Sequence, residues 1–202
     1  MKRLLITTIL LLAGWNFLFC GDVPRSGIGV RGSAFGIPNQ ILDLFIYEHP
    51  EIRGESFAIE IRSYGSKGPR SVFSGVYSLE YSKMDGEGPW SDEEGHRTLN
   101  GVGEVKQLSF TATVLMNIFP SSPIHLYIGA GLGVGRISIW YEGNYVDELG
   151  TVISDSYEEN RIIPVGHVPV GVIINYRDKI ELRIEGGFKN GFYAGAGLVV
   201  NF

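Results

Sequence analysis

The chain has 202 residues, of which 44% are hydrophobic and 19% charged, and its formal net charge is −5. The mean hydropathy of +0.09 is too low for a protein built from transmembrane helices. An acidic chain without basic clusters also argues against a nucleic-acid partner. Transmembrane strands alternate apolar and polar residues and so dilute such averages, which leaves a membrane β-barrel open.

The first 20 residues have the pattern of a signal peptide. Lys2 and Arg3 form a positive n-region, and an uncharged apolar run follows from Leu4 to Leu12. We expect cleavage near Cys20, the only cysteine, by the ordinary signal peptidase. Lipidation of Cys20 is the alternative, although Phe19 fits poorly the small residue that a lipoprotein signal needs. The mature domain, expected over residues 27–202, would then hold no disulfide.

Beyond the leader, apolar and polar residues alternate with a period of two, which predicts strands. The clearest pattern is the last one, where every even-numbered residue from Phe192 to Phe202 is apolar. Before it, Lys189-Asn190-Gly191 predicts a tight hairpin turn, because Asn-Gly accepts positive φ. The eight predicted strands lie within residues 27–36, 57–62, 73–82, 107–118, 124–135, 168–176, 180–188 and 192–202.

The connections between these strands alternate in length. The long ones are residues 37–55, 83–103 and 141–160, and the short ones are 65–70, 120–123 and 177–179. Outer-membrane barrels have short periplasmic turns and longer outer loops. We therefore expect an all-β fold, a closed eight-stranded antiparallel up-and-down transmembrane β-barrel with both termini on the inner side. Pro164 and Pro169 each remove a ladder hydrogen bond, so we expect a bulge in strand six.

Three features favour a membrane barrel over a soluble one. The polar face is rich in glycine, as at positions 129, 131, 133 and 135, which suits a narrow lumen that must hold side chains from opposite walls. The apolar face carries almost no charge where it would meet lipid, and Lys106 and Arg136 fall at outer strand ends. Aromatic residues mark the strand ends, with Tyr176 and Phe202 expected at the inner rim and Tyr81, Trp140, Phe188 and Phe192 at the outer rim.

The end of the chain, Leu198-Val199-Val200-Asn201-Phe202, and the glycine-rich stretch 129–135 resemble small outer-membrane barrels such as the OmpA transmembrane domain, OmpX and OmpW-like proteins. The resemblance implies that Leu198, Val200 and Phe202 form the signal read by the barrel-assembly machinery. It further implies a place in the bacterial outer membrane, with membrane lipids and lipopolysaccharide as partners. We expect a monomer.

Charged residues on the inward face are the main candidate site. One hypothesis is a gated pore or proton path; the favoured one is a paired network that plugs the lumen, because an unpaired buried charge is severely costly. The predicted lumen network comprises Arg31, Glu60, Arg62, Glu80, Glu181, Arg183 and Glu185.

We expect no catalytic, cofactor or metal site. His125 and His167 point inward by parity, but neither matches the His-x-Ser pair of lipid A deacylase barrels. The acidic residues of 83–103 and 141–160 lack EF-hand spacing and are interpreted as a solvated surface. A divalent-cation contact with lipopolysaccharide phosphates or a basic partner is the alternative, and Lys106, Arg136 and Arg161 are candidates for direct contact with lipid phosphates.

The expected function is that of a non-enzymatic outer-membrane protein with an envelope-structural or surface-interaction role through its outer loops. Two alternatives come from other classes: a narrow channel for small or apolar solutes, and a lipid A-modifying enzyme. Fold alone does not choose among them.

Overall fold

The computed structural model describes residues 23–36, 49–91, 98–146 and 151–202. The expected signal peptide and Cys20 lie outside the described residues. Among the described residues, no helix is long and apolar enough to cross a membrane. The elements are β1 (Ser26–Gly36), β2 (Arg53–Tyr64), the short 3-10 helix η1 (Gly68–Arg70), β3 (Phe73–Ser91), β4 (Thr98–Ile118), β5 (Ile124–Val146), β6 (Val152–Tyr176), β7 (Ile180–Phe188) and β8 (Phe192–Asn201).

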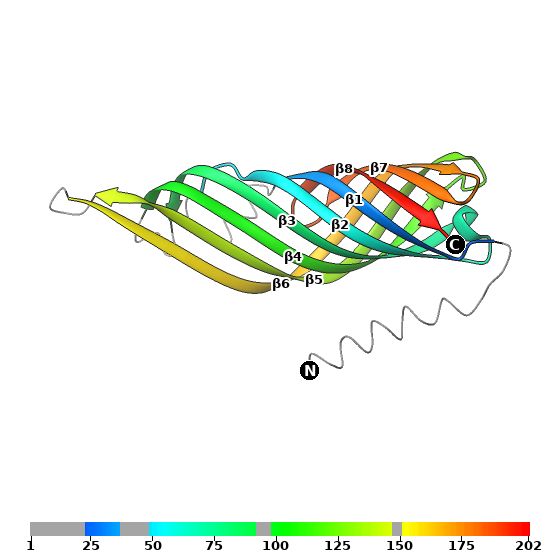
Figure 1. Ribbon diagram of the computed structural model, residues 1–202, viewed down its shortest axis with the longest axis horizontal. Helices are drawn as coiled ribbons and strands as arrows, with labels where there is room; N and C mark the ends of the chain where they lie inside the picture. Colours follow the sequence, from blue (N-terminus) through cyan, green and yellow to red (C-terminus); the bar gives the residue numbers. More distant parts are fainter. Residues whose placement is uncertain (1–22, 37–48, 92–97, 147–150) are drawn as a thin grey trace, which may run out of the picture.

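The eight strands form one closed, antiparallel ring (Figure 1). Each strand pairs with the next, and β1 closes the ring on β8 from Gly27 opposite Asn201 to Gly36 opposite Phe192. Closure leaves no free strand edge at membrane depth, where no water is present to satisfy one. The predicted fold class, a closed up-and-down barrel, is confirmed.

Side chains on the outer surface of the barrel are apolar and exposed. Fractional exposures of 44% for Ile128, 54% for Val170 and 56% for Ile184 are typical of this surface. The same surface includes Ile28, Val30, Phe57, Ile59, Leu79, Phe110, Val114, Leu126, Leu132, Leu182, Leu198 and Val200. A soluble protein does not expose a continuous apolar band of this extent. The band is the part that faces lipid, and the barrel spans a membrane.

The four middle strands are much longer than predicted. β3, β4, β5 and β6 have 19, 21, 23 and 25 residues and run far beyond the outer end of β1, β7 and β8 (Figure 1). The stretches 83–103 and 141–160, predicted as loops, are therefore mostly strand. Outside the bilayer no apolar face is required, so carboxylates and glycines alternate there and the strand pattern is weak. We call this outer part of β3–β6 the projecting sheet.

The bulge expected in β6 is absent. β5 and β6 keep one register from Ile124 opposite Ile174 to Val146 opposite Val152, and only the two pairs around Pro169 are missing from the ladder. A Cβ on Gly129 would lie only 3.0 Å from Cγ of the Pro169 ring, so the glycine makes room for the proline. Pro164 lies beyond the last pair of β6 with β7, so its missing N–H costs no ladder bond there.

The β7–β8 turn also bonds to the edge of β6 just past its last pair with β7. Asn190 has φ 50°, as predicted for this turn. Its side-chain amide donates to the Pro164 carbonyl at 2.7 Å and accepts from the Gly166 N–H at 3.1 Å. One side chain thus takes the place of a neighbouring strand at the point where β7 ends.

The inward glycines of β5 make room for the adjacent strand and not, as the sequence suggests, for the opposite walls. A Cβ on Gly133 would lie 2.0 Å from the Phe110 carbonyl oxygen, and one on Gly131 would lie 2.3 Å from Thr113 Oγ1. Both contacts are with β4. The glycines therefore allow a close approach of two neighbouring strands.

Candidate functional site

All seven charged residues of the predicted lumen network are buried in the barrel interior, where they form two clusters. In the first cluster Arg31, 1% exposed, is the centre. Its Nη1 donates to Glu185 Oε1 at 2.5 Å, its Nη2 to Glu80, and its Nε lies 3.6 Å from Glu60 Oε1. Three carboxylates from β2, β3 and β7 thus share one guanidinium that extends from β1.

The second cluster lies nearer the inner rim. Arg62 Nη1 contacts Glu181 Oε2 at 2.5 Å, and Arg62 Nη2 donates to Ser74 Oγ at 3.0 Å. The hydroxyl of Tyr64 lies 3.0 Å from Glu181 Oε1. Arg183 belongs to the first cluster, because it contacts both Glu60 and Glu185.

Lys189 is a further member that the sequence interpretation missed. Its Nζ lies 2.7 Å from Glu80 Oε2, and the residue is 1% exposed. The sequence places it in a hairpin turn, where a lysine is ordinarily solvated. Its addition gives the network four cations against four carboxylates, so the buried charges balance.

The interior at this level is filled. Arg62 is 0% exposed and Arg183 2%, and Glu60 and Glu181 are each 1% exposed. Side chains that lined an open water-filled pore would be accessible to solvent, and these are not. Buried charges are tolerated when each is paired and hydrogen-bonded, so the arrangement suits a rigid, neutral plug.

The two inward histidines are held by neutral groups. His167 lies between Thr113 Oγ1 at 2.8 Å from Nδ1 and the Tyr193 hydroxyl at 2.9 Å from Nε2. His125 Nδ1 lies 3.1 Å from the Ser122 carbonyl oxygen, while its Nε2 has no hydrogen-bond partner in the part of the chain that the structure describes. Among the described residues no carboxylate orients either histidine, as one would in an acid–base pair for nucleophilic catalysis.

The projecting sheet carries two bands of charge on its outer face. Next to the apolar surface lie Lys83, Lys106 and Arg136, and Arg136 Nη2 donates to Asn160 at 3.2 Å. Beyond them Glu104 accepts from Lys106 and from Lys83, the latter at 2.6 Å. These hydrogen bonds lower the pKa of Glu104 below its ordinary value and raise the pKa of both lysines.

An apolar cluster packs on the inner face of the outer strands, which the prediction of loops had missed. Trp90 and Met84 are 0% exposed, and Trp90 stacks on Tyr141 with ring centroids 5.6 Å apart. Tyr141 in turn stacks on Tyr157 at 5.1 Å. A Cβ on Gly103 would lie 2.3 Å from the Trp90 ring. The indole can therefore approach β4 closely only because residue 103 is glycine. Arg161, predicted near the outer rim, contacts Glu159 on this same face.

No group of three His, Cys, Asp or Glu residues suited to hold a metal ion occurs within residues 23–36, 49–91, 98–146 and 151–202.

The residues of the expected assembly signal point outward. Leu198, Val200 and Phe202 are 45%, 53% and 50% exposed on one face of the last strand. Phe202 is held by its backbone, since its N–H donates to the Ser26 carbonyl at 2.9 Å. The three side chains thus lie on the outer surface of the barrel.

We expect Phe202→Ser to reduce the amount of folded barrel in the outer membrane several-fold in cells, because the residue would be read during assembly. The same variant should refold in detergent like the unsubstituted protein, since the Phe202 side chain is half exposed at the end of the last strand. Heat-modifiable migration on gels measures both. Phe192→Ser, at the other end of β8 and 66% exposed, is the matched control. Equal losses for the two variants in cells would remove the special role of Phe202.

No protein-family model matches the chain, and no curated protein matches it in sequence. Solved structures do match. Neisserial surface protein A has a TM-score of 0.53 at 15% identity, covering 88% of this chain and 97% of that one. Ail, the attachment invasion locus protein of Yersinia pestis, solved with the heparin analogue sucrose octasulfate, has a TM-score of 0.50 at 12% identity, covering 89% and 100%. This chain therefore has the fold of the small eight-stranded outer-membrane β-barrels.

Proposed function

We propose that the protein is a non-enzymatic outer-membrane surface protein that presents its projecting sheet as a contact surface outside the cell. One observation carries the proposal. β3, β4, β5 and β6 run far beyond the outer end of β1, β7 and β8, and β6 continues for sixteen residues past its last pair with β7. An ordered sheet of this length beyond the apolar band is a surface that another protein can contact.

The interior supports this proposal over the two alternatives. A channel needs a water-accessible lumen, whereas the paired clusters around Arg31 and Arg62 exclude water from theirs. A lipid A-modifying enzyme needs a nucleophile and base that lipid can reach, whereas His167 is 4% exposed and faces inward. Bilayer conductance above background would favour the channel instead.

Lipid phosphates are the second partner that we propose. Lys83, Lys106 and Arg136 form the first polar row beyond the apolar surface, at the depth where phosphates of the outer leaflet lie. At this level lysine and arginine side chains can bind phosphate groups in addition to their carboxylate and amide partners within the protein. Ail was solved with a polyanion, but the acidic projecting sheet of this chain makes such a ligand a poor fit at its outer part.

Surface labelling tests the proposal. We expect Ser154→Cys, near the outer end of β6, to react in whole cells with a membrane-impermeant maleimide. Ser66→Cys, in the turn between β2 and η1 at the other end of the barrel, should react only after lysis. The unsubstituted chain controls for Cys20. The reverse pattern would place the projecting sheet in the periplasm and end the proposal.

Contact with a partner is tested by shortening the β5–β6 hairpin. A variant that replaces residues 141–157 by a four-residue turn keeps the apolar band and the lumen network. Cells with the unsubstituted protein should be retained on part of a panel of immobilised proteins and glycans, and cells with the shortened protein should not. Equal retention, or none for either, would contradict the proposal.

A further inference from the structure

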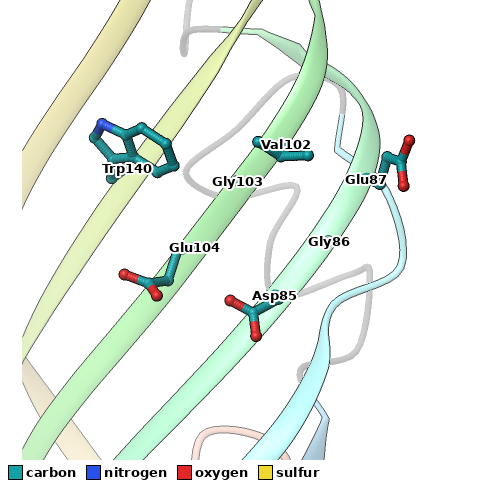
Figure 2. Close-up of a pocket in the computed structure, with 7 residues that line it drawn as sticks. All are labelled: Asp85, Gly86, Glu87, Val102, Gly103, Glu104 and Trp140. Atoms are coloured by element: carbon teal, nitrogen blue, oxygen red, sulfur yellow. The ribbon is translucent and has the colours of Figure 1, made fainter.

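The outer face of the projecting sheet contains a shallow hollow with an aromatic wall. It measures about 470 Å³ and is lined by Asp85, Gly86 and Glu87 of β3, Val102, Gly103 and Glu104 of β4, and Trp140 of β5. Trp140 lies on one side and Glu87 on the other, with Val102 between them and Glu104 and Asp85 below (Figure 2). Gly86 and Gly103 face each other in the strand pairing, and a Cβ on either would point to the other face of the sheet, towards Trp90, so they contribute only backbone to the hollow.

Trp140 lies beyond the apolar band, among charged residues. The sequence predicts it in the outer aromatic rim, but its neighbours across the sheet are Glu104 and Glu158. It lies four residues beyond Arg136, which is the first polar residue on this face of β5. The indole is 37% exposed and Val102 is 50% exposed, both among carboxylates and outside the apolar band.

The carboxylates around the hollow are not all neutralised. Glu104 is paired with Lys83 and Lys106. Asp85 is 67% exposed in its side chain and lies 3.5 Å from Lys83, which Glu104 already holds at 2.6 Å. In the described part of the chain neither Glu87 nor Glu142 has an ion pair, and both are exposed.

The stretches of sequence that contain the projecting sheet and the segments joining its strands are acidic as a whole. Residues 84–105 and 141–160 contain twelve of the 22 acidic residues of the chain and one of its 17 lysines and arginines. The remainder of the chain is therefore net positive. A cationic partner is attracted to the outer part of the molecule, and an anionic one is repelled from it.

We propose that this hollow binds an arginine side chain from a basic peptide segment of a protein outside the cell. The inference rests on the proposed function, since it names the partner chemistry of the projecting sheet. The guanidinium stacks on the exposed Trp140 ring, and Asp85 and Glu87 accept its N–H groups. Lys83 and Lys106 lie on the membrane side of the hollow, so the peptide approaches from the outer side.

Arginine suits the hollow better than lysine for two reasons. Its planar guanidinium stacks on an indole face, and it is less strongly hydrated than an ammonium group. Its several donors can also serve carboxylates on neighbouring strands at once. A surface that acted only through its total charge would not distinguish the two residues.

The test measures peptide binding to the full barrel in nanodiscs of zwitterionic phosphatidylcholine by calorimetry. We expect hexa-arginine to bind more tightly than hexa-lysine. Trp140→Leu should weaken hexa-arginine about two- to fivefold and abolish the preference for arginine. Asp85→Asn with Glu87→Gln should weaken it about three- to tenfold, as the loss of two exposed charge contacts implies.

Asp155→Asn with Glu159→Gln is the matched control. These two residues lie on the inner face of β6, away from the hollow, and their substitution removes the same charge from the same sheet. The hexa-arginine binding constant of this control variant should stay within about a factor of two of the unsubstituted value, because its substitutions lie away from the hollow. Equal weakening by the two double variants, or unchanged binding by Trp140→Leu, would overturn the proposal. Surface labelling of Ser154→Cys is independent of this result, so a failed hollow and a failed surface role are told apart.

Discussion

Replacing Arg31 by methionine is expected to lower the free energy of unfolding of the barrel by about 3–5 kcal/mol. The substitution keeps most of the side-chain volume and removes the charge shared by Glu60, Glu80 and Glu185. Lys189 and Arg183 remain, but they cannot satisfy three carboxylates. An uncompensated buried charge is far more costly than a lost surface pair.

Denaturant unfolding in phospholipid vesicles measures this loss. Arg53→Met is the control, because Arg53 pairs with Glu51 at 2.5 Å but its side chain is 76% exposed. An exposed pair contributes about 0–1 kcal/mol, so the control should lose no more than that. Similar losses for the two variants would show that the interior is wet and would reopen the channel alternative.

The second large effect is expected on the lipid side. Ile128→Arg should cost about 2–4 kcal/mol, the penalty for a charge near the middle of the bilayer. Ile128 lies opposite Met116 on β4 and Val170 on β6, so no polar neighbour could receive the guanidinium. The same unfolding experiment, with the protein in vesicles, gives the value.

Ile162→Arg is the matched control for depth. Ile162 is 79% exposed on the outer face of β6 and lies opposite Arg136, at the outer limit of the apolar surface. The cost of a charge falls to about 0–1 kcal/mol near the interface, so this variant should be almost as stable as the unsubstituted protein. Equal costs at both positions would mean that residue 128 does not face hydrocarbon.

The membrane part of the fold could be predicted from the sequence, and the outer part could not. Where one face of a strand meets lipid and the other meets the lumen, every second residue must be apolar. The strands around Leu126 and Leu198 can therefore be recognised directly in the sequence. Past Lys83 and Arg136 the constraint ends. There Gly101, Gly103 and Gly143 alternate with carboxylates, a composition that also suits loops, although paired strands form.

The site was predictable for the same reason and to the same extent. Charges at inward parity within clear strands, such as Glu60 and Arg183, could be assigned to the lumen. Lys189 could not be assigned to the lumen, because residues in a turn do not alternate between two faces. Only the folded barrel brings its ammonium group to Glu80. The residue type of Trp140 indicates a rim, whereas its place is set by strand lengths that the sequence did not reveal.

The length of β6 sets how far the molecule reaches from the cell. From Ile162 to Val152 the strand continues for ten residues past the apolar surface. At about 3.3 Å per residue and a tilt of about 40°, its end stands roughly 25 Å above the hydrocarbon. That height lies among the sugars nearest the membrane. Cells that carry long polysaccharide chains would therefore hide this tip, and cells with short chains would offer it to their surroundings.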